Sequence, residues 1–117
     1  MEERQALSAF AALSQETRLR IVRLLVQAGP AGMPAGAIAE AAGVSASNVS
    51  FHLKELTQAG LASAKREARS IVYTADYDAL SGLIQFLMRD CCAGHPDICM
   101  PATASACTSD SKELSRA

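Results

Sequence analysis

The sequence predicts a mainly α-helical protein with one small β-hairpin. Three observations support this fold class: apolar residues recur at three- and four-residue spacing over most of the chain, glycine or proline ends these segments, and one short stretch is strand-like. The 117 residues, of which 50% are apolar, suffice for the core of one domain. We therefore expect a domain over residues 1–92 and a cysteine-containing tail over residues 93–117, with a Ser/Thr/Ala-rich composition that favours mobility at its end.

The first two helices are predicted over residues 4–12 and 14–27. Ser14 is expected to cap the second helix with its side chain, and Gly29-Pro30 is expected to end it. The expected apolar positions are Leu7, Phe10 and Ala11 in the first helix, and Leu19, Val22, Leu25 and Val26 in the second.

The next two helices are predicted to form a helix-turn-helix. A loop through Gly32 and Met33 precedes a short helix over residues 35–42, where Ile38 faces inward. A glycine turn follows, and Ser45 is expected to cap a longer helix that Gly60 stops. The expected buried face of this longer helix is Ala46, Val49, Leu53 and Leu56.

The outer face of the longer helix carries small hydrogen-bonding groups, one aromatic ring and one cation. Such a surface suits the major groove of DNA, although any solvated amphipathic helix could show the same pattern. Residues 61–65 and 70–74 then read as two strands, joined by the basic connector 66–69. The order helix, turn, helix, hairpin predicts a winged helix-turn-helix. The candidate DNA contacts are Ser45, Ser47, Asn48, Ser50, Phe51, His52, Lys54, Lys65, Arg66 and Arg69.

A last helix is predicted over residues 76–90, with an apolar stripe that is large for the end of a small monomer. Its members are Leu80, Leu83, Ile84, Leu87 and Met88. Together with the first helix, this stripe predicts a homodimer that forms through residues 5–13 and 78–89.

The charge distribution and the expected location of the protein bear on its DNA binding and on the chemistry of its cysteines. The formal net charge is -1, while Val44 to Ala75 carries four cations against two glutamates, a local balance of +2. No apolar run is long enough to span a bilayer, and the charged start is unlike a secretory signal, so a cytoplasmic location is expected. Thiols stay reduced there, and all four cysteines lie between positions 91 and 107. Metal binding or redox chemistry is therefore favoured over structural disulfides.

The sequence resembles the ArsR/SmtB family of metal-responsive repressors over about residues 5–90. Three segments carry the resemblance: Leu13-Ser14-Gln15-Glu16-Thr17-Arg18-Leu19-Arg20-Ile21, Val49-Ser50-Phe51-His52-Leu53-Lys54-Glu55-Leu56, and Ala59-Gly60-Leu61. The resemblance implies a homodimeric repressor that binds a near-palindromic double-stranded operator and leaves it when an inducer binds. It implies no catalysis, and no phosphate loop, paired carboxylates or Cys-His-Asp pattern suggests an enzyme.

Sensing sites in this family differ in position. The cysteine pair that some members carry before the recognition helix is missing, since residues 34–42 hold no Cys or His. The last helix has Asp76, Asp78 and Asp90 but lacks the histidines of zinc sensors. What remains resembles the arsenic-responsive subgroup that places a Cys-Cys pair and a further cysteine after the last helix. The resemblance thus implies Cys91, Cys92 and Cys99 as metal ligands.

Trivalent arsenic, As(III), suits three thiolates because it is soft and pyramidal. Antimony, Sb(III), or methylarsenite would suit the same sulfurs. The alternatives are zinc or cadmium, with His95 or Cys107 as a fourth ligand, a thiol redox switch, and cysteines without a role. A metalloid-binding protein that does not bind DNA is a further alternative.

Overall fold

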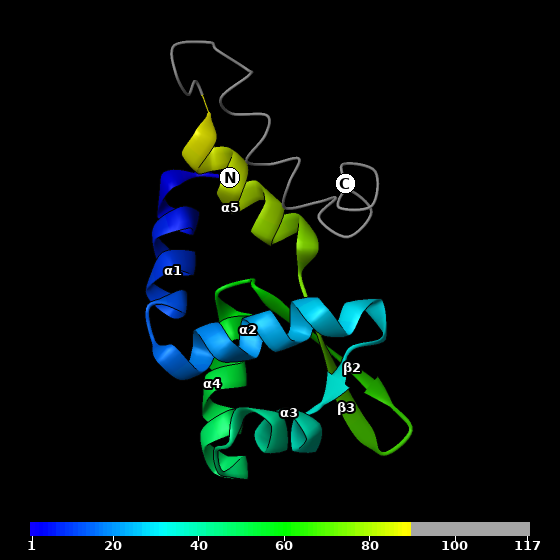
Figure 1. Cartoon of the computed structure of the whole chain (residues 1–117). Coiled ribbons are helices and arrows are strands. Elements are labelled where there is room, and N and C mark those ends of the chain that lie inside the picture. The colour runs from blue at the N-terminus through cyan, green and yellow to red at the C-terminus, as the bar shows by residue number, and fades with distance from the viewer. Residues whose placement is uncertain (90–117) are drawn as a thin grey trace, which may run out of the picture.

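The computed structural model describes residues 1–89, which form several helices and a small sheet whose hairpin projects to one side (Figure 1). The elements are α1 (Glu3–Leu13), α2 (Glu16–Ala28), the 3-10 turn η1 (Gly29–Ala31), β1 (Met33–Pro34), α3 (Ala35–Ala42), α4 (Ala46–Gln58), β2 (Ala62–Glu67), β3 (Ser70–Ala75) and α5 (Tyr77–Met88). The expected fold class, mainly α with a small hairpin, is confirmed. The expected boundary after residue 92 and the tail 93–117 lie outside the described residues.

The sheet has three antiparallel strands in the order β1-β3-β2, one more than the hairpin predicted from sequence. Met33 of β1 pairs with Tyr73 of β3, where a loop was expected. A two-residue strand is too short to show alternation, so no local pattern indicates it. Gly32 allows this pairing: its φ is +73°, and a Cβ there would lie 2.5 Å from the carbonyl oxygen of Tyr73.

The hairpin turn is shorter than the predicted connector 66–69. Glu67 pairs with Ser70, so Arg66 and Glu67 belong to β2 and only two residues form the turn. The first of these, Ala68, has a φ of +54°, in the left-handed region that tight hairpin turns require.

At the starts of α2 and α4, a side chain accepts a backbone N–H group of the first turn. Ser45 caps α4 as expected, since its Oγ accepts from the amide of Asn48 at 3.2 Å. The expected cap at Ser14 is wrong: its hydroxyl donates to the carbonyl of Ala11, at the end of α1. Gln15 caps α2 instead, its Oε1 accepting from the amide of Arg18 at 2.9 Å. The longer side chain of Gln15 thus has the capping role that was expected of Ser14.

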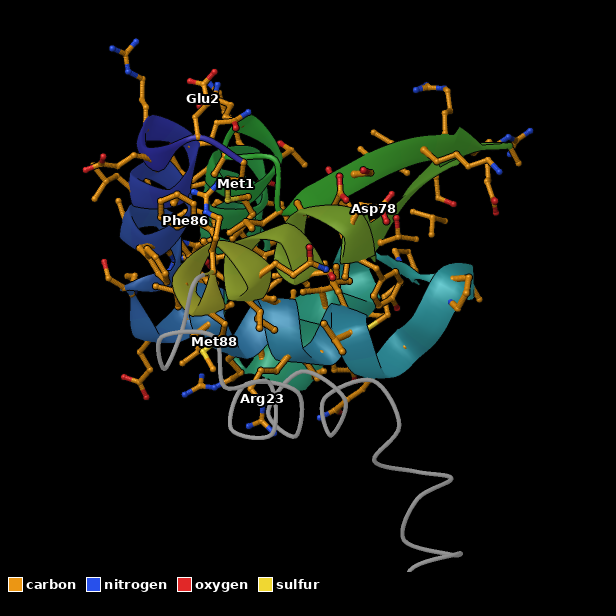
Figure 2. All side chains as sticks on the ribbon, turned by 90° about the horizontal axis from the view of Figure 1, so that it is seen from above. Met1, Glu2, Arg23, Asp78, Phe86 and Met88 are labelled. Carbon is orange, nitrogen blue, oxygen red and sulfur yellow. The ribbon has the colours of Figure 1, made fainter. Side chains whose placement is uncertain are left out.

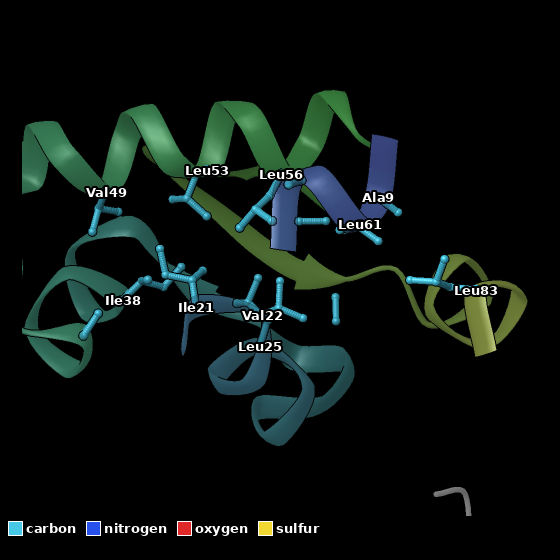
Figure 3. Packing of buried hydrophobic residues seen from close by; sticks show 14 of the residues in the cluster. Ala9, Ile21, Val22, Leu25, Ile38, Val49, Leu53, Leu56, Leu61 and Leu83 are labelled. Atoms are coloured by element: carbon cyan, nitrogen blue, oxygen red, sulfur yellow. The ribbon is translucent and has the colours of Figure 1, made fainter. Parts of the chain in front are cut away.

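The core lies where α2, α3 and α4 meet the sheet (Figure 3). Its largest fully buried side chains are Ile21, Leu25, Ile38, Val49, Leu53, Leu56 and Leu61. Each such side chain contributes roughly 1.5–3 kcal/mol through burial. Three expected core positions are wrong: Leu19 and Val26 are 48% and 42% exposed, and Ala46 is exposed. The buried stripe of α2 is rotated toward Ile21, which the sequence interpretation left out.

The first and last helices lie together at one end of the molecule, and α3 and the start of α4 lie at the other (Figure 1). Asp76 caps α5, and the helix ends at Met88 rather than at residue 90 as expected. Leu83 is the buried residue of α5, with 5% of its surface exposed. Several large apolar side chains of this end face solvent: Leu7, Phe10, Ile84 and Leu87.

Candidate nucleic-acid interface

Helix α4 has two distinct faces. Val49, Leu53 and Leu56 have no exposed surface and point toward α2 and α3 (Figure 3). The opposite face is in solvent, and the predicted contacts that lie on it are Ser45, Ser47, Asn48, Ser50, Phe51 and Lys54. The apolar stripe thus fixes the rotation of α4 so that its polar groups face outward together.

Two of these hydroxyls have contacts within the helix start. The Oγ atoms of Ser45 and Ser47 lie 3.3 Å apart, and Ser45 also accepts the amide of Asn48. Ser50 and Lys54 stand farther along the same face. The most available groups of α4 are therefore its central ones, beside the ring of Phe51, which is 54% exposed.

The hairpin of β2 and β3 extends away from the helices, as Figure 2 shows. Lys65, Arg66 and Arg69 are all exposed, as expected. However, Lys65 and Arg66 are consecutive residues of one strand, so they point to opposite faces of the hairpin. Lys65 lies 3.9 Å from Glu67 in an exposed pair that contributes little. The structure therefore does not bring all three cations to one surface.

His52 differs from the other predicted contacts because it is half-buried against α2. Its Nδ1 accepts a hydrogen bond from Nε of Arg18 at 3.1 Å, which leaves Nε2 as the nitrogen available to DNA. The pKa of His52 is lowered from 6.5, first by burial and then by the Arg18 charge, while Glu55 opposes the shift. Both causes favour the neutral form of the His52 ring.

Arg18 is a residue that the sequence interpretation did not include in the site. Besides its bond to His52, its guanidinium carbon lies 5.4 Å from the centre of the Phe51 ring. Arg18 occurs in the segment that carries the family resemblance, but only the fold places it against a helix that starts 28 residues later.

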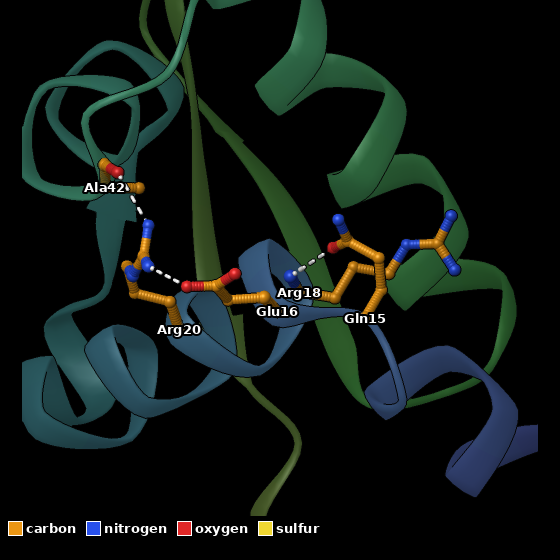
Figure 4. A network of polar contacts seen from close by, with 5 residues as sticks. All are labelled: Gln15, Glu16, Arg18, Arg20 and Ala42. Carbon is orange, nitrogen blue, oxygen red and sulfur yellow. Dashed lines mark hydrogen bonds and ion pairs between the residues drawn. The ribbon is translucent and has the colours of Figure 1, made fainter.

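Arg20, on another side of α2, bonds this helix to the end of α3. Its two terminal nitrogens donate to the carbonyl of Ala42 at 3.1 Å and to Glu16 Oε2 at 2.9 Å. Figure 4 shows Arg20 reaching the end of α3, whereas Arg18 points the other way. The two arginines thus connect α2 to both helices of the helix-turn-helix.

The predicted metal ligands Cys91, Cys92 and Cys99 lie outside the described residues. Within residues 1–89, no three His, Cys, Asp or Glu side chains gather as a metal site would require. Over the same range, no helix has the length and apolar character needed to cross a bilayer.

Known proteins are similar to this chain in sequence and in fold. A family model described as a helix-turn-helix domain matches residues 13–63. The HTH-type transcriptional regulator YgaV of Escherichia coli (strain K12) is 33% identical over 88 residues, which are 75% of this chain and 87% of that protein.

Solved structures of transcriptional regulators resemble this one in fold. An ArsR-like transcriptional regulator from Rhodococcus sp. RHA1 has a TM-score of 0.65 at 34% identity, covering 73% of this chain and 77% of that one. The homodimeric winged helix-turn-helix DNA-binding domain Mb0332 from Mycobacterium bovis has a TM-score of 0.60 at 29% identity, covering 77% and 89%. A possible transcriptional regulator for arsenical resistance has a TM-score of 0.57 at 29% identity, covering 66% and 77%. The chain therefore belongs to the ArsR family of winged helix-turn-helix transcriptional regulators.

Proposed function

We propose that this protein is a homodimeric repressor that leaves its operator when trivalent arsenic binds Cys91, Cys92 and Cys99. The observation that carries the DNA-binding part is the outward face of α4, whose polar side chains and Phe51 are exposed while the opposite face is fully buried. A rigid helix that presents hydrogen-bonding groups together is what reading base edges requires.

The dimer is supported by the exposed apolar side chains of α1 and α5. Leu7 and Leu87 are 62% and 60% exposed, and Phe10 and Ile84 accompany them. The related domain from Mycobacterium bovis is homodimeric. Pairing through this end leaves α4 and the hairpin of each protomer free, so two recognition helices address the two halves of a near-palindromic operator.

The inducer is supported by the chemistry of the cysteines and by one relative. Three thiolates suit a soft, pyramidal arsenic centre, and a structural relative is named for arsenical resistance. Cys91 follows the last residue of α5 by only three positions, so a metalloid there adjoins a helix of the proposed dimer interface. Release then follows from linkage, in which the metalloid binds the DNA-free form better.

The test is a titration of the full-length protein bound to a fluorescent DNA fragment from upstream of its own gene, followed by anisotropy. Arsenite should weaken binding by about 5 to 150 fold. Antimonite, methylarsenite, zinc, cadmium and an oxidant are added separately. If zinc, cadmium or the oxidant released the DNA and arsenite did not, that agent would be the inducer in place of arsenic. Failure of the protein to bind the fragment would remove the repressor function.

A further inference from the structure

A polar brace joins α2 to the recognition helix. Arg18 Nε donates to Nδ1 of His52 at 3.1 Å, and the Arg18 guanidinium carbon lies 5.4 Å from the centre of the Phe51 ring. The rings of Phe51 and His52 are themselves edge-on to each other at 5.4 Å. One guanidinium thus contacts two consecutive side chains of α4.

This brace is directional, unlike the rest of the contact. Leu53 and Leu56 hold α4 against the core by apolar packing, which is non-directional. Within residues 1–89, the bond between Arg18 and His52 is the one hydrogen bond that joins a side chain of α2 to a side chain of α4. Phe51 stands on the exposed face, one helical turn from Ser47 and Lys54. Holding its ring therefore limits the orientations open to the neighbouring DNA-facing groups.

The bond depends on the protonation of His52. Arginine only donates, so Nδ1 must be the unprotonated acceptor and the neutral ring must carry its proton on Nε2. A second proton removes the acceptor and places two cations side by side. Burial and the charge of Arg18 on α2 lower the pKa, and Glu55 on α4 raises it. Among the described residues, α1, α3 and β2, which also pack on α4, supply none of the charges that shift it.

The released guanidinium has room to move. A cavity of about 220 Å³ opens between α1, α2 and α4, and its lining includes Arg18 and Glu55. Across it stand Ser8 and Ala12 of α1. Arg18 can therefore exchange His52 for the carboxylate of Glu55 without disturbing the apolar core.

We propose that Arg18 is a positioning residue for DNA recognition, which holds Phe51 and His52 in their binding orientation, and that a proton on Nδ1 of His52 releases this hold. The proposal rests on the proposed DNA-binding function. It makes operator affinity fall with acidification, opposite to the rise that added positive charge alone would give.

The test compares the full-length parent with Arg18→Met, His52→Gln and Arg23→Met on the same upstream DNA fragment, at about pH 8 and about pH 5.5. Arg23 is an exposed arginine of α2 (Figure 2), so its variant controls for the loss of one charge. Acidification should weaken the parent and Arg23→Met by about threefold to tenfold more than it weakens Arg18→Met or His52→Gln. His95 is present in all four proteins, so whatever it contributes is the same in each and cancels in the comparison.

A second measurement does not involve DNA. Long-range proton–nitrogen NMR of the His52 ring should show the Nε2–H tautomer above its pKa, and Arg18→Met should raise that pKa. A parent that binds DNA with the same pH profile as Arg18→Met would overturn the inference, as would the Nδ1–H tautomer. A parent that fails to bind at either pH would instead overturn the proposed function, which keeps the two failures distinct.

Discussion

Ser14 and Gln15 are neighbours between α1 and α2, yet their side chains serve different helices. The hydroxyl of Ser14 donates to the carbonyl of Ala11 in the last turn of α1, while the amide oxygen of Gln15 accepts the N–H of Arg18 in the first turn of α2. Ser45 has no such competitor, because Gly43 ends α3 two residues earlier in a left-handed conformation. A cap is therefore predictable where one polar residue stands alone, and ambiguous where two stand together.

Replacing Ser45 with Ala should lower the free energy of unfolding by about 0.5–2 kcal/mol, because the Asn48 amide loses its acceptor. Urea denaturation followed by circular dichroism measures this loss. Ser50→Ala, on the same exposed face, is the control and should change stability by less than about 0.5 kcal/mol. Equal stability of the two variants would show that the cap does not hold α4.

The cysteines provide the second prediction at the residue scale. Cys91→Ser, Cys92→Ser and Cys99→Ser should each leave DNA binding intact and abolish release by arsenite, because each substitution removes one of the three proposed thiolate ligands. Cys107→Ser should keep both properties, since three thiolates already satisfy a pyramidal arsenic centre and a fourth sulfur would have to displace one of them. Anisotropy with arsenite measures both. An arsenite-blind Cys107→Ser, or an inducible Cys99→Ser, would reassign the third ligand.

At the scale of elements, α4 and the hairpin differ in what they offer to DNA. The outward face of α4 is defined by the fully buried Val49, Leu53 and Leu56 opposite it. The hairpin instead alternates, so Lys65 and Arg66 point to opposite faces and Arg69 stands in the turn. In the proposed function, α4 therefore reads the bases and the hairpin supplies cations for phosphates.

Lys54→Ala and Arg69→Ala should each weaken operator binding and reduce the slope of log affinity against log salt by about one phosphate contact. Ser47→Ala and Asn48→Ala should instead change the preferred sequence with little change in slope. Anisotropy over a salt series, with operator and scrambled DNA, distinguishes the two effects. If all four variants behaved as the parent does, the interface would lie elsewhere.

At the scale of the whole molecule, the proposed function gives the two ends separate tasks. Helices α1 and α5 gather at one end with exposed apolar side chains, and the start of α4 lies at the other (Figure 1). An apolar end on a protein that also binds DNA is best covered by a second copy. The cavity beside Arg18 is lined by residues of α1, α2 and the C-terminal half of α4.

Leu87→Glu should convert the dimer to a monomer, because it places a charge in the apolar face of α5. Light scattering at micromolar concentration measures the mass. Leu19→Glu is the matched control, since Leu19 is similarly exposed, at 48%, but lies on α2. A dimeric Leu87→Glu would exclude this face as the interface.

The sequence alone determined the order of the helices, the cap at Ser45 and the buried stripe of α4 from Val49 to Leu56, because these depend on residues within one or two turns of each other. Only the tertiary structure decided three other features. It rotated α2 toward Ile21, so that Leu19 and Val26 face solvent. It paired Met33 with Tyr73, and it brought Arg18 to His52 across 34 positions. Each depends on a partner distant in the chain, and local periodicity carries no information about such a partner.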